Sequence, residues 1–444
     1  MHTLSQLRAG ELVGITRLDL SCGLTNFPDE IFNLADSLEI LNLSGNALSS
    51  LPDDLPKLHK LRVIFCSDNL FTALPEVLGQ CLQLEMVGFK ANQIKHVSEK
   101  SLPKKLRWLI LTDNKITELP SALGSCIRLQ KLMLSGNQLQ TLPPEMATCT
   151  ELELLRISAN DFTVLPEWLL SLPKLAWLAY AGNPFSDNYE MAVTAEQNIT
   201  RIDWAAIELQ QSLGEGASGI IYRANYLQKD GSLPVAVKVF KGAVTSDGLP
   251  RSEKAASIAV SGHSGLIPVV GKIIGHPQNA SGLVMSLIEP SFINLAQPPS
   301  LESCTRDIYL AERRFTLVQV LSIAFNIASV AKHLHSKAVM HGDLYAHNIL
   351  WDEQTESLLG DFGAASFLPP HNKQLAENIQ RIEVRAFACL LEELLNHCDV
   401  LQAEQEKFNI LLTLQKRCAH LQIDTRPLFG EIEIILRACC DLSS

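Results

Sequence analysis

A repeat with a period of 23 residues dominates the first half of this chain of 444 residues. Apolar anchors recur at this spacing, with one interval of 22 residues, at Ile15, Leu38, Leu61, Leu84, Leu106, Leu129, Leu152 and Leu175. A unit of this length forms one short strand and a return segment, and it cannot bury its apolar side chains alone. Stacked units share a continuous core, so the repeat predicts a solenoid with a parallel sheet along its inner curve.

An asparagine follows seven of these anchors at a distance of eight residues. The seven are Asn46, Asn69, Asn92, Asn114, Asn137, Asn160 and Asn183. We expect their side chains to satisfy backbone groups where the chain leaves each strand. A Leu-Pro or Phe-Pro pair usually comes next, and the full pattern, LxxLxLxxNxLxxLPxxLxxLxx, resembles the leucine-rich repeat family.

The eleven cysteines are scattered along the chain without CxxC pairs. Cys81, Cys126 and Cys149 each lie 20 residues after an anchor, where other repeats carry Leu58 and Leu172. These cysteines therefore replace core leucines. In a reducing compartment we expect the cysteines to be small buried apolar residues rather than disulfides or metal ligands.

Alternate residues of each expected strand face the inner curve, and two columns there are unusually apolar. One column is Ile40, Val63, Met86, Trp108, Lys131, Leu154 and Trp177, and the other is Asn42, Phe65, Gly88, Ile110, Met133, Arg156 and Ala179. Exposed apolar patches with aromatic residues are typical of protein-binding surfaces. We expect a protein partner or substrate to bind at Trp108, Trp177, Phe65, Ile110 and Met133. The alternative is that a later segment of the same chain packs into this groove.

The second half contains a stretch, Val339 to Gly363, whose polar residues suit phosphoryl transfer. Asp343 would orient the attacking hydroxyl as the catalytic carboxylate. Asn348 and Asp361 would hold magnesium against nucleotide phosphates, since Mg²⁺ prefers hard oxygen ligands and keeps most of its waters.

Two further motifs lie upstream in the expected order. The segment LGEGASG consists of Leu213, Gly214, Glu215, Gly216, Ala217, Ser218 and Gly219, and Ala236-Val237-Lys238 follows it. A glycine-rich loop, an AVK strand, a DxxxxN loop and a DFG motif in this order resemble the protein-kinase family. A lone glycine-rich loop would be weak support, whereas the ordered set is specific.

The resemblance implies ATP and Mg²⁺ as cofactors and a role for each motif residue. The glycine-rich loop would approach the phosphates, and Lys238 would contact them while paired with Glu253. The adenine would lie between Ile221 and Ala236 above and Leu350 below, beside Met285 and the backbone of Ser286 and Ile288. The apolar run that ends near His335 resembles the long core helix before the catalytic loop.

Several positions depart from the family pattern. Gly342 replaces the Arg of the HRD motif, so control by phosphorylation of the activation segment is not expected, and Ser366 is the sole hydroxyl residue from Asp361 to Glu383. Tyr345 replaces the Lys that is typical of serine/threonine kinases. Glu383 stands where an Asp normally fixes the catalytic loop, which puts the partner of Arg426 in doubt. The HGD spelling resembles aminoglycoside and choline kinases.

Charge and hydropathy exclude other classes of function. The formal net charge is −11, which argues against nucleic acid as a partner. The N-terminus lacks the pattern of a secretory signal, and no stretch reaches the roughly 18 apolar residues of a membrane helix. We therefore expect a cytoplasmic protein without a membrane span. Plant receptor kinases combine the same modules with a membrane helix, so the chain resembles the soluble bacterial leucine-rich-repeat serine/threonine kinases instead.

The expected fold is an α/β leucine-rich repeat solenoid followed by an α+β bilobal protein-kinase-like domain. We expect the repeats in residues 1–185, a cap or semi-rigid linker in 186–206 and the kinase-like domain in 207–444. The resemblance implies a protein kinase that transfers the γ-phosphate of ATP to Ser or Thr hydroxyls, with the repeats as a protein-binding module. The alternatives are a scaffold with a weak or inactive kinase domain and a kinase of small molecules.

Overall fold

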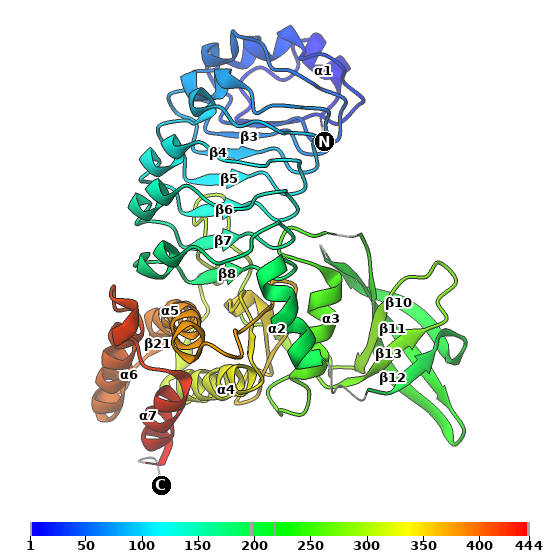
Figure 1. Ribbon diagram of the computed structural model, residues 1–444, viewed down its shortest axis with the longest axis vertical. Coiled ribbons are helices and arrows are strands. Elements are labelled where there is room, and N and C mark those ends of the chain that lie inside the picture. The colour runs from blue at the N-terminus through cyan, green and yellow to red at the C-terminus, as the bar shows by residue number, and fades with distance from the viewer. Residues whose placement is uncertain (1, 195–198, 217, 243, 442–444) are drawn as a thin grey trace. The chain divides into compact units, whose positions relative to one another are not determined.

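The chain divides into two compact units, Met1–Leu175 and Ala176–Ser444. Short parallel strands form the sheet of the first unit. The structure is a computed structural model that describes residues 2–194, 199–216, 218–242 and 244–441. The strands of the first unit pair in chain order, as Figure 1 shows. They are β1 (Arg17–Asp19), β2 (Ile40–Asn42), β3 (Val63–Phe65), β4 (Met86–Gly88), β5 (Trp108–Ile110), β6 (Lys131–Met133) and β7 (Leu154–Arg156).

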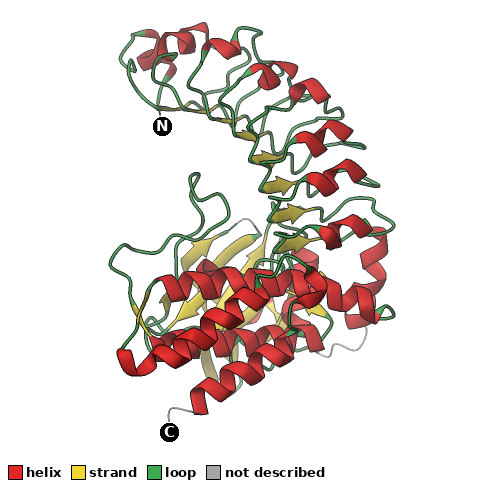
Figure 2. Cartoon of the chain, turned by 90° about the vertical axis from the view of Figure 1, so that its left-hand side faces the viewer, coloured by secondary structure: helices red, strands yellow, loops and turns green. Residues whose placement is uncertain are grey.

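Short helices return the chain from one strand to the next. Figure 2 shows them on the outer side of the first unit, with the strands on its inner side. After α1 (Leu4–Arg8) they are the 3₁₀ helices η1 (Asp29–Leu34), η2 (Leu55–Lys57), η3 (Glu76–Gln80), η4 (Glu99–Ser101), η5 (Ser121–Ser125), η6 (Pro144–Thr148) and η7 (Glu167–Ser171). Short 3₁₀ turns suit a unit of this length, because it has too few residues for a longer helix.

The repeat core forms as the sequence predicts. Leu41 of β2 pairs with Leu18 on one side and Ile64 on the other, and all three side chains are fully buried. Cys81 and Cys126 are buried and unbridged, as expected. Burial raises the pKa of each of these two thiols to about 11, so they remain protonated at neutral pH.

The asparagines bind backbone groups of neighbouring repeats. The Oδ1 atom of Asn92 accepts a hydrogen bond from the backbone N–H of Phe71 at 3.0 Å. Its Nδ2 atom donates to the carbonyl oxygens of Cys66 at 3.0 Å and Phe89 at 3.2 Å. Asn114 makes the same contacts one repeat later. The expected role of the asparagine column is confirmed, and each asparagine satisfies groups that would otherwise be buried without a partner.

The inner face carries a contact cluster of Phe65, Trp108 and Lys131. The rings of Phe65 and Trp108 meet edge to face with centroids 6.5 Å apart, and Nζ of Lys131 lies 4.3 Å from the centroid of the Trp108 ring. Phe65, Trp108 and Ile110 are half-buried, whereas Met133 is buried at 7% exposure. Phe65, Trp108 and Ile110 therefore retain surface for a partner, and Met133 contributes to the core.

The second unit contains a six-stranded sheet. Its strands lie in the order β10 (Ile207–Glu215), β11 (Gly219–Gln228), β12 (Gly231–Phe240), β14 (Gly282–Ser286), β13 (Val269–Ile274) and β9 (Arg201–Asp203). Helix α3 (Pro250–Ala259) follows β12, and the 3₁₀ helix η8 (Trp204–Ala206) joins β9 to β10. The core of this part is apolar, with Ile202, Ala224, Val235, Val237 and Val284 at or near zero exposure.

The rest of the second unit is mainly helical. Its helices are α4 (Leu317–Ser336), η9 (Ala346–Asn348), α5 (Lys373–Asn396), η10 (Gln402–Glu404), α6 (Gln405–Cys418), η11 (Ile423–Thr425) and α7 (Phe429–Asp441). Small sheets join β15 (Ile293–Asn294) to β18 (Ile349–Trp351) and β19 (Ser357–Leu359), β16 (Phe315–Thr316) to β21 (Cys398–Asp399), and β17 (Val339–Met340) to β20 (Ser366–Phe367). A mainly β part and a mainly helical part agree with the expected bilobal domain.

Helix α4 is the one helix in the described part of the chain that is long and apolar enough to cross a membrane. Within its apolar window, 56% of the residues are buried inside the structure. The core helix of a globular domain meets the same criteria of length and composition, so α4 is weak support for a membrane span. The expected long core helix before the catalytic loop is present at this place.

The last repeat strand belongs to the second unit. Strand β8 (Trp177–Ala179) contacts α5, and helix α2 (Pro184–Thr194) contacts α3 and β20. The compact units therefore divide after Leu175, earlier than the boundary that we expected after residue 185. Helix α2 and strand β9 occupy most of the expected linker, while residues 195–198 lie outside the described part. The difference arises because the side chains of β8 are buried within the second unit and α2 contacts α3 and β20.

We expect Asn92→Ala to lower the free energy of unfolding of the first unit by about 3 kcal/mol, because buried groups of Phe71 and Cys66 lose their partner. Urea unfolding followed by circular dichroism measures this loss. Asn26→Ala is the matched control, because Asn26 is exposed and its side chain donates to the neighbouring hydroxyl of Thr25. Equal unfolding midpoints for the two variants would contradict the role assigned to the asparagine column.

Candidate active site

Lys238 of β12 and Glu253 of α3 form a buried ion pair. The two residues are 9% and 3% exposed. Pro250 begins α3 and places Glu253 in its first turn, with its side chain toward the sheet. The structure therefore joins the two residues that the sequence pairs.

Burial raises the pKa of the Glu253 carboxyl group above its ordinary value. The charge of Lys238 acts in the opposite direction and favours the carboxylate, while the charge of Asp361 adds to the rise. Asp361 is close because both carboxylates flank Gly363, whose added Cβ would lie 3.2 Å from Oδ1 of Asp361 and 3.9 Å from Oε2 of Glu253. Two acidic groups and one amine thus face the same space.

Asp343 and Asn348 are held together within the catalytic loop. Nδ2 of Asn348 donates to the backbone oxygen and to Oδ2 of Asp343, each at 2.9 Å. This use of the amide nitrogen fixes the orientation of the side chain and leaves its carbonyl oxygen as an acceptor. The spacing of five residues suits this contact because η9 (Ala346–Asn348) turns the chain back toward Asp343.

Paired strands bring Asp361 toward Asn348. Strands β18 and β19 pair Ile349 with Leu359, and the N–H of Gly360 donates to the backbone oxygen of Asn348 at 2.9 Å. Asp361 follows in the left-handed region with φ of 52°, and its Oδ1 accepts from the N–H of Gly363 at 3.1 Å. A carboxylate and an amide oxygen suit Mg²⁺ that also binds phosphate oxygens. The described residues contain no group of three or more His, Cys, Asp or Glu side chains that could hold a metal ion.

Gly342 occupies a position that no larger residue could take without displacement. Its φ is 74°, and an added Cβ would lie 2.5 Å from the carbonyl oxygen of Ala364 and 2.8 Å from that of Leu178. Its N–H donates to Oε1 of Glu383 at 2.7 Å, and Oε2 of Glu383 lies 2.7 Å from Nε2 of His335. Glu383 therefore fixes the catalytic loop, and the close backbone approach explains why this loop has no arginine.

Tyr345 lies beneath Trp177 instead of facing solvent. The two rings stack with centroids 4.1 Å apart and an interplanar angle of 5°. Nε1 of Trp177 donates to the carbonyl oxygen of Leu344 at 3.1 Å. Trp177 is 1% exposed, so the expectation that it binds a protein partner is wrong. The alternative applies to this residue, because a later segment of the same chain covers it.

Asp307, which sequence reasoning missed, binds His347 of the catalytic loop. Nδ1 of the His347 ring lies 2.7 Å from Oδ1 of Asp307. The backbone N–H of His347 donates to Oδ2 of Asp307 at 3.0 Å. Burial lowers the pKa of His347. The hydrogen bond to Asp307 and the negative charges of Asp307, Asp343 and Asp361 act in the opposite direction. Together they raise the pKa above its ordinary value. No motif contains Asp307, so only the fold reveals the pair.

One cavity collects the residues that the motifs single out around Lys238. It measures about 160 Å³. The predicted residues that line it are Gly216, Ser218, Gly219, Ile221, Lys238, Glu253, Met285 and Asp361. Gly219 has a steric reason to be glycine, because its Cβ would lie 2.4 Å from the carbonyl oxygen of Val239. Gly214 and Gly216 have open space around them, which suits a loop that approaches a ligand.

The remaining predicted residues lie outside the lining of this cavity. Leu213, Gly214 and Glu215 end strand β10 and are exposed. Ala236 pairs with Met285 across β12 and β14. Ser286 ends β14, Ile288 follows two residues later and Leu350 lies in β18, and all three are half-buried. The N–H of Ser286 donates to the carbonyl oxygen of Pro268 at 2.9 Å. Ala217 lies outside the described residues.

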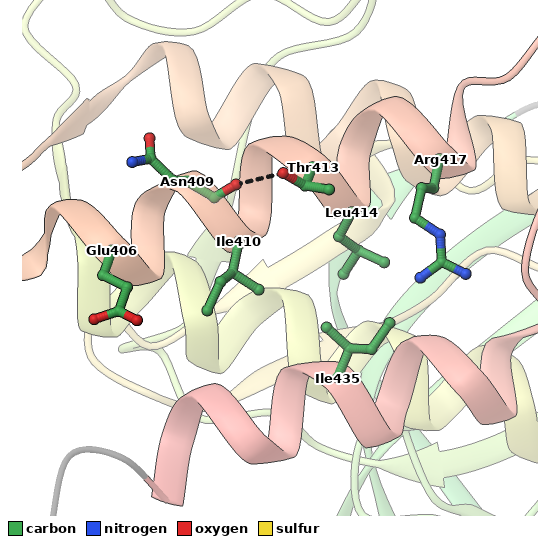
Figure 3. Close-up of a pocket in the computed structure, with 7 residues that line it drawn as sticks. All are labelled: Glu406, Asn409, Ile410, Thr413, Leu414, Arg417 and Ile435. Atoms are coloured by element: carbon green, nitrogen blue, oxygen red, sulfur yellow. Dashed lines mark hydrogen bonds between the residues drawn. The ribbon is translucent and has the colours of Figure 1, made fainter.

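A larger cavity of about 530 Å³ lies between α6 and α7 (Figure 3). It is lined by Glu406, Asn409, Ile410, Thr413, Leu414, Arg417 and Ile435. The side chain of Thr413 donates to the backbone oxygen of Asn409 at 2.8 Å within the same helix. None of the residues that the motifs predict lines this cavity, so cavity size alone would point to the wrong place.

Comparisons with known families agree with both halves of this description. The model of the protein tyrosine and serine/threonine kinase family matches residues 207–397. Models of the leucine-rich repeat match residues 127–185, 37–58 and 105–126. The kinase match begins where we expected the kinase-like domain to begin.

Curated proteins that are similar to part of this chain are named as protein kinases or as a growth factor receptor. The serine/threonine-protein kinase-transforming protein mos of Moloney murine sarcoma virus is 26% identical over 185 residues, which are 38% of this chain and 48% of that protein. The megakaryocyte-associated tyrosine-protein kinase of Rattus norvegicus is 29% identical over 39% of this chain and 34% of its own length. Fibroblast growth factor receptor 1 of Pleurodeles waltl is 26% identical over 35% of this chain and 20% of its own length. The chain spans about half or less of the length of these relatives.

We expect Gly342→Ala to lower the free energy of unfolding of the second unit by about 2–4 kcal/mol. The left-handed backbone costs about 1–2 kcal/mol with a Cβ, and the contact with two carbonyl oxygens adds overpacking. Thermal unfolding of the full chain measures the change. Gly430→Ala in α7 is the control, because nothing lies within 4 Å of its added Cβ. A melting temperature unchanged in Gly342→Ala would show that this glycine is not needed for the loop.

Proposed function

This chain carries leucine-rich repeats followed by a protein-kinase domain, and we propose on that premise that it transfers the γ-phosphate of ATP to a Ser or Thr hydroxyl of a protein. The observation that carries the proposal is the convergence of Lys238, Glu253 and Asp361 on one cavity, with Asp343 bound to Asn348 beside Asp361. An amine, an amide and three carboxylates of these types match the groups that phosphoryl transfer needs.

Each of these residues has a task in the proposed reaction. Asp343 orients the acceptor hydroxyl and takes its proton, and Lys238 donates to the α- and β-phosphates while Glu253 holds its ammonium group in place. The backbone of the glycine-rich loop contributes N–H donors to the phosphates. Catalysis of this kind depends on positioning and on charge stabilisation, with no covalent intermediate on the protein.

Asn348 and Asp361 are the proposed magnesium ligands. Their oxygen atoms would hold Mg²⁺, which would supply charge neutralisation at the phosphates. The contact between Asn348 and Asp343 ties the ligand to the catalytic carboxylate, so the two groups keep a fixed separation.

The adenine site is proposed along β12, β14 and β18. Ala236 and Ile221 would cover the base from one side and Leu350 from the other, with Met285 at the back of the site. The N–H of Ser286 already donates to the carbonyl oxygen of Pro268. We therefore propose that Ser286 contacts adenine through its own carbonyl oxygen. The N–H of Ile288 is the second proposed contact.

We also propose that the repeats bind a protein partner or substrate at Phe65, Trp108 and Ile110. These residues are half-buried and include a ring pair, which suits a partner with apolar side chains. Cytoplasm is the proposed compartment, for which the unbridged cysteines of the described residues are the support.

We expect full-length protein with radiolabelled ATP and Mg²⁺ to label itself or an added protein. Asp343→Asn and Lys238→Met should each reduce the rate about 10²–10⁴-fold, since one removes the catalytic carboxylate and the other the phosphate-binding amine. The controls are Lys229→Met and Asp230→Asn at the exposed turn between β11 and β12, which carry the same changes away from the cavity. Both controls should keep the wild-type rate.

Phosphoamino-acid analysis of the labelled product tests the acceptor, and phosphotyrosine would overturn the Ser/Thr assignment. Labelling that persists in Asp343→Asn would show that the assigned site is wrong. Nucleotide binding without transfer would favour a scaffold with an inactive kinase domain. The replacement of the family lysine by Tyr345 is consistent with that alternative. Transfer to an aminoglycoside or choline alone would favour a kinase of small molecules.

A further inference from the structure

Residues 176–194 combine the last repeat strand, β8, with helix α2, and both lie within the second unit. We refer to them as the 176–194 segment. By sequence this segment continues the repeats, since Trp177 falls in the same strand column as Trp108. By contact it belongs to the kinase domain, where it touches three parts of the candidate active site.

The first contact is with the catalytic loop. Trp177 stacks on Tyr345 and donates through Nε1 to the carbonyl oxygen of Leu344. The carbonyl oxygen of Leu178 lies against Gly342 on the other side of Asp343 in the sequence. The residues before and after Asp343 are therefore both packed against β8, which restricts the movement of the catalytic carboxylate.

The second contact is with β20, which follows the DFG motif. The N–H of Tyr180 donates to Oγ of Ser366 at 2.9 Å, and its hydroxyl donates to the carbonyl oxygen of Phe367 at 3.0 Å. Tyr180 is fully buried, and burial raises the pKa of its hydroxyl above the ordinary value, so it remains a donor. Strand β20 pairs with β17 through Ser366 and Met340, directly before the catalytic loop.

The third contact is with α3. The Oγ of Ser252, a residue with 1% exposure, donates to Oε2 of Glu190 in α2 at 2.8 Å. Ser252 directly precedes Glu253, the partner of Lys238. Figure 1 shows α2 beside α3. A second link, between Asp187 and Arg251 at 3.4 Å, is exposed on both sides and contributes little.

From these contacts we infer that the 176–194 segment is a positioning element of the kinase active site. Through Trp177 it holds the catalytic loop, and through Glu190 it holds the helix that carries Glu253. The inference rests on the proposed kinase function. Its physical basis is that transfer requires the reacting groups to be placed within about 0.5 Å, which demands firm support behind the loop.

The first test is Trp177→Ala in the full chain. We expect kcat for phosphoryl transfer to fall about 10–100-fold, because loss of the stack and of the bond to Leu344 releases the loop that carries Asp343. The KM for ATP should stay within about twofold, since the residues around Lys238 are untouched. Trp177→Phe, which keeps a ring over Tyr345, should recover most of kcat.

The matched control is Trp168→Ala, a tryptophan in η7 on the helical side of the preceding repeat. This variant should keep the wild-type kcat. A double-mutant cycle of Trp177→Ala with Tyr345→Ala adds a second criterion. If the two residues act as one stack, the kcat of the double variant should be no lower than that of the slower single variant. Equal kcat values for wild type and Trp177→Ala would overturn the inference about the loop.

The second test addresses α3. Glu190→Ala should weaken ATP binding about 3–10-fold, measured by calorimetry with Mg²⁺, because Ser252 loses its acceptor and the Lys238–Glu253 pair is less firmly placed. Glu190→Gln keeps an acceptor oxygen and should bind ATP as wild type does. Asp187→Ala on the same helix is the control and should change little. Unaltered ATP binding in Glu190→Ala would show that α2 does not position α3.

Hydrogen exchange separates this inference from the proposed function. Amides of residues 339–348 should exchange faster in Trp177→Ala than in wild type, and at the wild-type rate in Trp168→Ala. Faster exchange is expected even if the chain transfers no phosphate. A lack of transfer would refute the proposed function but not the positioning role. Unchanged exchange in Trp177→Ala would refute the positioning role, whatever the activity.

Discussion

The buried ion pair between Lys238 and Glu253 is the contact on which the arrangement of the second unit depends. Removing two charges from water costs several kcal/mol for each ion, and their attraction offsets this cost only in a good geometry. The pair is therefore poorly explained as a source of stability. It does fix α3 to the β-sheet and place an ammonium group at the wall of the cavity. Either partner alone would be a buried charge without compensation, which explains why support for α3 from a neighbouring helix matters.

The contacts that the sequence predicted correctly came mostly from local or periodic patterns. The asparagine column followed from its fixed distance after each anchor, and Asn92 makes the bonds that this position requires. Convergence of Lys238 with Glu253, and of Asp343 with Asn348, followed from the order and spacing of the motifs. Spacing succeeds in these cases because one strand, one helix turn or one short loop connects the partners, so the chain between them has few conformations.

Contacts between distant segments could not be predicted in the same way. Trp177 and Leu344 are 167 positions apart, and Asp307 and His347 are 40 positions apart, with no motif in common. The periodicity placed Trp177 on a strand face but could not say what covers that face. From the sequence, a protein partner was the favoured occupant of this apolar column, and a later segment of the same chain was the alternative. Only the folded chain shows that Tyr345 covers the tryptophan.

The departures from the kinase pattern form one connected set when they are viewed from β8. A side chain at position 342 would strike the carbonyl oxygens of Ala364 and Leu178, so the arginine of the family is excluded by backbone. The carboxylate of Glu383 reaches both the N–H of Gly342 and His335. Tyr345 replaces a lysine and offers a flat ring on which Trp177 stacks. A loop that had merely lost its function would carry substitutions without matching partners. Here each change at the loop is matched by a contact, and for Gly342 and Tyr345 that contact comes from the last repeat, which favours a working loop with a different support over a decayed one.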